Sequence, residues 1–315
     1  MSKSKRPAGA DASPAPKNKI KVFTDSSGRL RTGWLLALSL VSCALAALVV
    51  RGGLALCFKA LFGAWGIDES TAARAPGWAR WLYTWHGSLI SLAAAAAAIG
   101  LSATLRRLWR ISGNAPAFSA ARTALCWLIG TAMALLIAAL CLIPDSMRLE
   151  WPLSRPRFSG ALPALWIIGL AGVLAEEVFT KRVLFDGLRL RWGSTWAVTV
   201  ACAAFFLIGG GYAGNALCAA NVALLGLVCC SLHARRGVWT STAFRWGWSA
   251  ANMFLLGFGG EDHGLYRLYH ISEDWLTGGG SGLICGAWAT LLLSVFLLWL
   301  ERRKLFKALR RLKTN

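Results

Sequence analysis

The chain contains few charged residues, and acidic ones are especially scarce. Of its 315 residues only 15% are charged, and 14 Asp and Glu stand against 34 Lys and Arg, a formal net charge of +20. A soluble domain usually has about a quarter of its residues charged. So little charge, together with a hydrophobic content of 56%, excludes an ordinary soluble domain and predicts an integral membrane protein with several spans.

Histidine is scarce as well, and the cysteines lack the spacing of a disulfide framework or a metal site. The chain has four His and nine Cys. Most of the Cys fall within apolar runs, where they pack as small apolar residues, and the adjacent Cys229 and Cys230 do not form a C-x-x-C motif. The excess of basic residues is divided between both ends and several loops, which argues against nucleic acid as a partner.

Apolar runs recur along the whole chain. Crossing about 30 Å of hydrocarbon requires about 20 mostly apolar residues in a helix. Eight segments qualify, the first with an amphipathic continuation to residue 65: 34–50, 81–105, 121–143, 163–188, 194–209, 215–233, 238–258 and 282–300. We therefore predict an all-α fold, a polytopic bundle of about eight transmembrane helices.

The distribution of Lys and Arg predicts how this bundle is oriented. With both termini in the cytoplasm, basic residues favour the inside segments by about three to one, as the positive-inside rule requires. Residues 1–30 are expected to form a disordered basic cytoplasmic arm, residues 31–300 the bundle, and residues 301–315 a basic helical tail lying on membrane lipid. The predicted location is the plasma (inner) membrane of a bacterium.

Two acidic residues inside the fourth segment are the first candidates for a functional site. Glu176 and Glu177 follow a long apolar stretch, and ionisable residues within a span are costly. Consecutive helical positions point about 100° apart, so both carboxylates can flank one site. Lys181 lies one turn after Glu177 in the favourable order for an ion pair, and Arg182 offers a second counter-charge. Both a network that fixes helix packing and a carboxylate that accepts a proton or holds a cation fit this pattern.

The stretch LAEEVFTKRVLF resembles the EExxxR motif of the CPBP family, the CAAX proteases and bacteriocin-processing enzymes of the membrane. Glu176 and Glu177 stand for the paired acids, and Lys181 stands for the Arg. Phe206 resembles the Phe of the second motif, FxxxH, and Asn252 the Asn of the third. The resemblance implies a bundle of about eight helices in which the first Glu activates a water molecule that attacks a peptide bond.

The resemblance covers roughly residues 160–300 and includes WLTGGGSGLICGAW, which is similar to a TGGxxG stretch after the third motif. Both His positions of the family are occupied by other residues, Gly210 and Trp248. The chain's own His residues lie elsewhere: His86, His233, His263 and His270. In the family the motif His and Asn residues support the water or the oxyanion, so the replacement of both His implies weakened or lost peptidase activity. Without His ligands we expect neither a tightly bound zinc ion nor another cofactor.

Arg245 is a further ionisable residue within an apolar segment. It lies seven residues before Asn252, two helical turns away on the same face, and is expected to provide a counter-charge for the glutamates across the bundle. The candidate catalytic residues are Glu176, Glu177, Lys181, Arg182 and Asn252, and the candidate groove or supporting residues are Phe206, Gly210, Arg245 and Trp248.

Three functions agree with these features. The first is a CPBP-type endopeptidase with weakened or lost activity. The second is a pseudoprotease scaffold that binds a transmembrane or lipidated peptide without cutting it, favoured by Trp248, whose ring would fill the space of a substrate-facing imidazole. The third is a proton-coupled small transporter that uses Glu176 and Glu177 as a relay, although transporters often show internal repeats that this sequence lacks.

Overall fold

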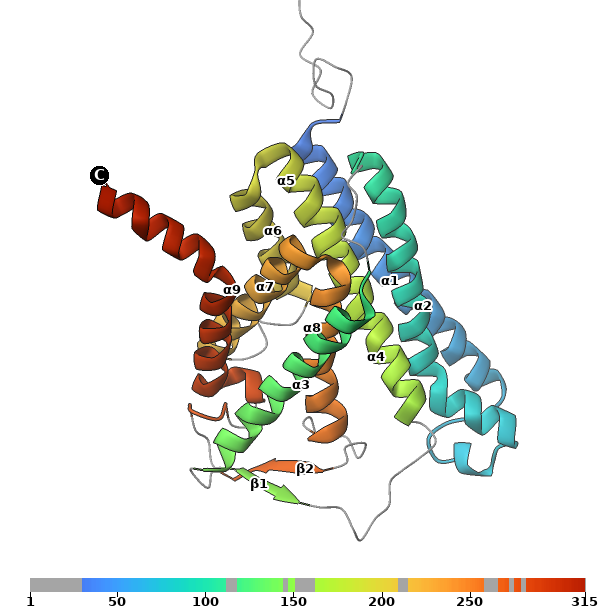
Figure 1. Ribbon diagram of the computed structural model, residues 1–315. Helices are drawn as coiled ribbons and strands as arrows, with labels where there is room; N and C mark the ends of the chain where they lie inside the picture. The colour runs from blue at the N-terminus through green and yellow to red at the C-terminus, as the bar shows by residue number, and fades with distance from the viewer. Residues whose placement is uncertain are drawn as a thin grey trace, which may run out of the picture.

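The computed structural model describes residues 30–111, 118–143, 147–150, 162–208, 215–257, 266–271, 275–278 and 282–314. Within these ranges the fold is all-α with one small antiparallel sheet (Figure 1). The elements in chain order are α1 (Thr32–Ala64), η1 (Ala72–Arg74), α2 (Gly77–Trp109), α3 (Ala120–Leu142), β1 (Met147–Glu150), α4 (Leu162–Glu177), η2 (Val178–Phe185), α5 (Asp186–Trp192), α6 (Ser194–Ile208), α7 (Ala216–Arg236), α8 (Val238–Ala250), η3 (Ala251–Leu255), β2 (Arg267–His270), η5 (Leu283–Cys285) and α9 (Ala287–Thr314).

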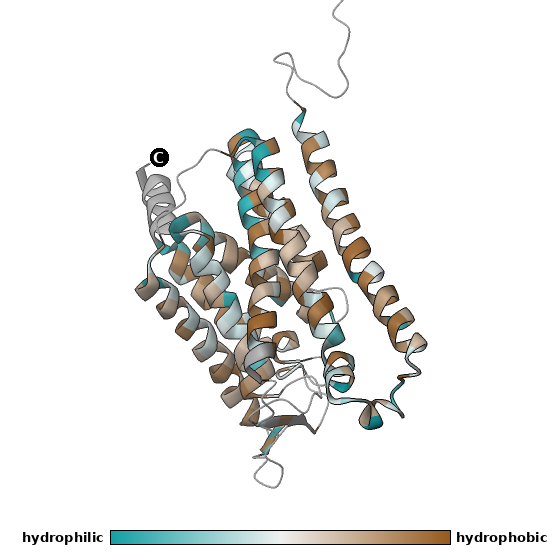
Figure 2. Cartoon of the chain, turned by 90° about the vertical axis from the view of Figure 1, so that its right-hand side faces the viewer, coloured by the Kyte–Doolittle hydropathy of each residue, from teal (hydrophilic) through white to brown (hydrophobic). Residues whose placement is uncertain are grey.

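Four of the described helices, α1, α2, α3 and α7, are long and apolar enough to cross a membrane. Their apolar side chains face outward as well as inward, and on α1 the side chains of Leu48, Val49 and Leu56 are each about two-thirds exposed. Figure 2 shows apolar residues along the length of the outlying helices. An outward apolar surface is costly in water and favourable in lipid, so the chain has the character of a membrane protein.

The first helix has the full length that the sequence suggested, including the continuation after residue 50. We expected a span over 34–50 with an amphipathic continuation, and the structure has one uninterrupted helix that packs along α2. Near its end the rings of Phe58 and Phe62 contact His86 of α2, and Phe62 also contacts Tyr83. These contacts between aromatic rings extend the α1–α2 pair to its far end.

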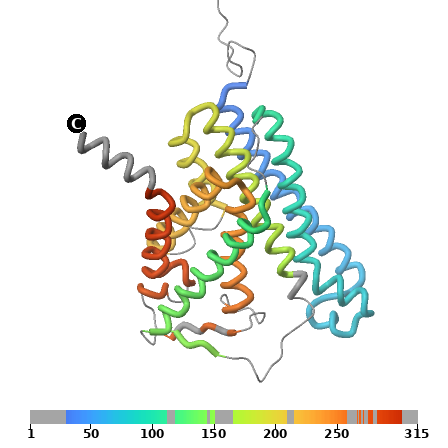
Figure 3. The backbone as a smooth tube through the Cα atoms, in the orientation of Figure 1, coloured from blue at the N-terminus to red at the C-terminus, as the bar shows by residue number. Residues whose placement is uncertain are grey.

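The two ends of the bundle contain different elements (Figures 1 and 3). The beginning of α1, the end of α2 and α5 lie at one end, while η1 and the sheet lie at the other. In the sheet β1 pairs with β2 so that Met147 faces His270. The sequence does not predict these strands, because both are short and lie in loops between apolar segments.

Close contacts between helices hold the centre of the bundle. Gly130 of α3 and Gly247 of α8 each lie against the backbone of the opposite helix, with no room for a Cβ atom. Asn221 of α7 is fully buried; its Nδ2 donates to the carbonyls of Ile284 (2.6 Å) and Gly286 (2.9 Å). The glycine-rich segment before α9 is therefore fixed to α7.

Two π-helical segments interrupt otherwise regular helices. Segment η2 joins α4 to α5, so that one helix runs from residue 162 to 192, and η3 continues α8 to Leu255. One begins directly after Glu177 and the other holds Asn252. π-Helical turns are rare and are often found at functional sites, so this placement directs attention to the charged residues of α4 and α8.

Candidate functional site

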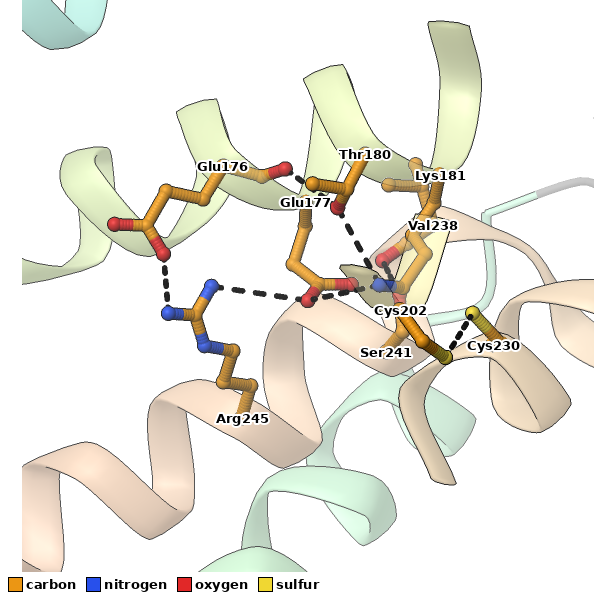
Figure 4. Close-up of polar contacts among 9 residues, drawn as sticks. All are labelled: Glu176, Glu177, Thr180, Lys181, Cys202, Cys230, Val238, Ser241 and Arg245. Atoms are coloured by element: carbon orange, nitrogen blue, oxygen red, sulfur yellow. Dashed lines mark hydrogen bonds and ion pairs between the residues drawn. The ribbon is translucent and has the colours of Figure 1, made fainter. Parts of the chain in front are cut away.

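A cluster of four charged side chains lies where α4 meets α8 (Figure 4). The Nη2 group of Arg245 donates a hydrogen bond to Oε2 of Glu176. Its Nη1 group lies 3.8 Å from Oε1 of Glu177. One guanidinium group therefore pairs with both carboxylates, and the expected counter-charge from across the bundle is present. We call Glu176, Glu177, Lys181 and Arg245 the charged cluster.

Lys181 completes the charged cluster from the same helix as the glutamates. Its Nζ lies 4.0 Å from Oε1 of Glu177, and both side chains are fully buried. The cluster contains two acids and two bases, so its formal charges balance. Because an uncompensated buried charge is strongly destabilising, this balance explains how four ionisable side chains are accommodated together.

The buried carboxylate of Glu177 is held by ion pairs that are longer than hydrogen bonds. Neither of its oxygens accepts a hydrogen bond from any described residue, and Nη1 of Arg245 likewise lacks an acceptor there. Separations of 3.8 and 4.0 Å exceed the normal length of a hydrogen bond. Charge attraction in a region of low dielectric therefore dominates at Glu177.

An aromatic ring and a hydroxyl group position the two cations. The Phe205 ring centroid lies 4.7 Å from Nζ of Lys181 and 4.5 Å from Cζ of Arg245. Both separations are suitable for cation–π contacts. Nζ of Lys181 also donates to Oγ1 of Thr180 (3.3 Å), whose hydroxyl in turn donates to the carbonyl of Glu176 (2.7 Å). The packing of α6 and the turn of η2 thus fix the cations.

The ring that contacts the two cations belongs to Phe205, the neighbour of the phenylalanine that matches the resembled motif. Phe206 matches the spacing of the resembled motif, but in the structure it packs at the side of the main apolar core. Phe205 is buried and lies against both cations. The available signal was helical periodicity: Phe205 lies four residues after Ala201 and eight after Ala197, and all three are buried on one face of α6.

Exposure distinguishes the two glutamates. The side chain of Glu176 is 32% exposed, whereas that of Glu177 is fully buried. Cys43 of α1 lies within electrostatic range of Glu176. The charged cluster is therefore open to its surroundings at Glu176.

Cysteine thiols lie on the opposite, buried side of the cluster. The Sγ atoms of Cys202 and Cys230 are 3.8 Å apart, and both residues lie within electrostatic range of Lys181. No disulfide bond joins any of the nine cysteines, all of which lie within the described residues. Most are buried, as expected for residues that pack as small apolar side chains.

Arg182 does not join the glutamates. Its position in the sequence predicts a second counter-charge, but Arg182 makes no ion pair with either carboxylate in the described part of the chain. Its charge instead interacts with those of Arg106 and Asp186. The reason is geometric: adjacent helical positions diverge by about 100°, so when Lys181 points into the cluster, Arg182 points away from it.

Two further expected residues have positions set by the α8–η3 helix. The Nδ2 group of Asn252 donates to the carbonyl of Trp248 one turn earlier (2.9 Å). Trp248 is buried in the main apolar core, with only 4% of its surface exposed. Its ring therefore fills the interior of the bundle. Gly210 lies outside the described residues.

The histidines that the structure describes make structural contacts. Nδ1 of His86 contacts the carbonyl of Tyr83 within α2. Nε2 of His233 lies 2.9 Å from Oδ1 of Asp186, and its ring packs edge-on against Phe185. His263 falls outside the described residues, as does the side chain of His270. Among the described residues no group of three or more His, Cys, Asp or Glu side chains is placed to hold a metal ion.

The chemistry open to the charged cluster follows from its geometry. Glu176 is the carboxylate that a ligand from outside can reach, and Arg245 is the cation that already occupies it. Any ligand that binds Glu176 must either displace this guanidinium group or bind beside it. No protein-family model, curated protein or solved structure matches the chain.

Proposed function

We propose that the chain is a divergent CPBP-like membrane protein that binds a transmembrane or lipidated peptide without efficient hydrolysis, with the charged cluster in place of a catalytic centre. The observation that carries this proposal is the pairing of Arg245 with both glutamates. A general base needs a carboxylate free to accept a proton from water. The carboxylate of Glu176 is engaged by a guanidinium group, and that of Glu177 is sealed from outside.

The residues around the cluster also favour binding over cutting. Acyl-transfer sites require preorganised donors aimed at the developing oxyanion. The amide group of Asn252 is engaged on its own helix, and Trp248 takes the place of a motif His within the core. The partly exposed Glu176 beside Cys43 is the position that a bound peptide would contact.

The proposed membrane arrangement has eight spans with both termini in the cytoplasm of the plasma (inner) membrane. The four long apolar helices support part of it. The shorter apolar helix α6, the helix through α4, η2 and α5, the helix through α8 and η3, and α9 would supply the remaining spans. Exposed tryptophans near the helix ends, including Trp34, Trp78, Trp192 and Trp275, agree with belts at the two membrane surfaces.

Photo-crosslinking of purified full-length protein in lipid nanodiscs tests peptide binding. The probes are a hydrophobic transmembrane peptide and a farnesylated peptide, each carrying a benzophenone group. We expect at least one to crosslink near Glu176 and to remain intact. Cys43→Trp should reduce crosslinking because its ring would crowd Glu176. Cys57→Trp, on an exposed position of the same helix, should leave it unchanged. Even labelling along the chain, or equal effects of the two variants, would contradict the proposal.

A proton-coupled transporter is the second candidate, favoured by the fully buried Glu177 and Lys181 pair. Intramembrane acid–base pairs often belong to proton relays. Uptake of protons into liposomes that contain the protein, abolished by Glu177→Gln, would support transport over peptide binding.

A further inference from the structure

Two cysteines of neighbouring helices lie against each other beside the charged cluster. Cys202 of α6 and Cys230 of α7 have their Sγ atoms 3.8 Å apart, close to van der Waals contact. Figure 4 shows this pair on the side of Lys181, away from Glu176. The two cysteines are 28 positions apart in the chain, so the packing of α6 on α7 brings their thiols together.

The backbones of α6 and α7 also approach closely at this place. Gly226 lies one turn before Cys230, and a Cβ atom there would lie 3.2 Å from Cδ1 of Phe205 and 3.6 Å from Sγ of Cys202. A disulfide requires Cα atoms within about 7 Å of each other. Because the helices are this close, small rotations of the two side chains bring the sulfur atoms into bonding distance.

The pair is secluded, and Cys202 is its more accessible member. Among the buried cysteines Cys202 is the most exposed, at 9%, whereas Cys230 is 2% exposed. Both belong to the same buried apolar group. Such surroundings exclude a charged oxidant and admit a small uncharged one, such as hydrogen peroxide. A thiol that lies next to a second, resolving thiol is the usual arrangement of a redox-sensitive cysteine pair.

We propose that Cys202 and Cys230 form an oxidation site at which hydrogen peroxide converts two thiols into a disulfide. First, the sulfur of Cys202 attacks one peroxide oxygen, the O–O bond breaks and a water molecule leaves, which gives a sulfenic acid. Next, the sulfur of Cys230 attacks Sγ of Cys202, the S–O bond breaks and a second water molecule leaves. The sulfur atoms give up two electrons to the peroxide, and both thiol protons depart with the water.

The disulfide would tie α6 to α7 next to the charged cluster. Phe205 lies three residues after Cys202 on α6, and its ring contacts both Lys181 and Arg245. The new bond therefore fixes the distance between α7 and the part of α6 that carries this ring. Because a thiol reductant reverses the bond, the site is a redox-sensitive link between two helices.

Oxidation of the purified full-length protein in phosphatidylcholine nanodiscs tests this site. The protein is treated with hydrogen peroxide, the remaining thiols are blocked with N-ethylmaleimide under denaturing conditions, and the digested chain is analysed by mass spectrometry without reduction. We expect a linked pair of peptides that joins Cys202 to Cys230 and disappears on treatment with dithiothreitol. Oxidation should also raise the thermal unfolding midpoint by a few degrees, because the bond closes a long loop of the chain.

Cys229→Ala is the matched control, because it removes the adjacent buried thiol of α7 and leaves the pair intact. Its linked peptide and its shift in the unfolding midpoint should equal those of the unaltered protein, whereas Cys202→Ala should lose both. Two outcomes would overturn the proposal. In one, Cys202 and Cys230 remain free thiols under conditions that oxidise glutathione in a parallel sample; in the other, Cys202 links to Cys229 as readily as to Cys230.

Discussion

Arg245 and Glu177 lie on different helices with Nη1 and Oε1 3.8 Å apart, although neither atom makes a hydrogen bond to a described residue. The guanidinium group reaches both this buried carboxylate and the more exposed one of Glu176. A single side chain of α8 thus pairs with two consecutive acids of α4, and Lys181 supplies the second positive charge. This relationship accounts for the balanced charge of the cluster and for the inhibition of general-base chemistry that we propose.

Lys181→Met tests the charge balance. It leaves the cluster with one excess negative charge, and breaking a buried ion pair typically costs about 3–5 kcal/mol of the free energy of unfolding. The double variant Lys181→Met/Glu177→Gln restores neutrality and should recover most of this loss. Unfolding in lipid bicelles gives the free energies of Lys181→Met, Glu177→Gln and the double variant.

The matched control for this cycle is Lys59→Met, because Lys59 is exposed on α1. It should change stability by less than about 0.5 kcal/mol. If the losses in Lys181→Met and Glu177→Gln simply add in the double variant, the two residues are not coupled and the cluster is not held by charge.

Gly247→Ala tests the close contact of α3 with α8. The added methyl group would meet the carbonyl of Trp127, and the helices must separate to admit it. We expect a loss of about 1–3 kcal/mol, typical of overpacking. Gly100→Ala, in open space on α2, should be neutral or slightly stabilising. Equal thermal unfolding midpoints for the two variants would show that α3 and α8 do not approach as described.

The turn between α1 and α2 should respond to acid. The Asp68 carboxylate accepts hydrogen bonds from the hydroxyl and backbone N–H groups of Ser70 and Thr71, which lower the pKa of Asp68 to about 2. A depressed pKa means that the turn is fully stabilised above the ordinary value of 3.8 and loses this stabilisation as the pH falls through about 2. Amide hydrogen exchange of residues 68–74 measures this change.

Asp68→Asn removes the titrating group and should make exchange in this turn independent of pH in the acid range, after correction for the intrinsic rate. An Asp68 that titrates in its ordinary range in the folded protein would refute these hydrogen bonds.

The sequence located the charged cluster because ionisable residues within apolar segments are few. Glu176, Glu177, Lys181 and Arg245 were recognised in this way, and the structure brings all four together. Arg182 was wrongly expected to pair with the glutamates, because the spacing of residues along the chain does not show which face of the helix is turned toward its neighbours. Which of the rings of Phe205 and Phe206 contacts the cations depends on the same orientation. Once a helix is docked, one face is fixed toward the site and every adjacent position turns away.

The π-helical segments and the short strands could not be predicted from the sequence for another reason. The π-helical turns of η2 and η3 depend on packing against neighbours, and no residue type in VFTKRVLF specifies them. Strands β1 and β2 are four residues each and stabilise one another across a long separation in the chain. The beginnings of the long helices, in contrast, follow from apolar runs and agree with the structure to within a few residues.

The most direct test of the central claim is peptide hydrolysis measured by mass spectrometry. Full-length protein in nanodiscs is incubated with a mixture of synthetic transmembrane and farnesylated peptides, and the products are compared with those of Glu176→Ala. If the charged cluster has replaced a catalytic centre, the peptides remain intact with both proteins or show the same slow background products. Cleavage by the unaltered protein that Glu176→Ala abolishes would contradict the account and establish an active protease.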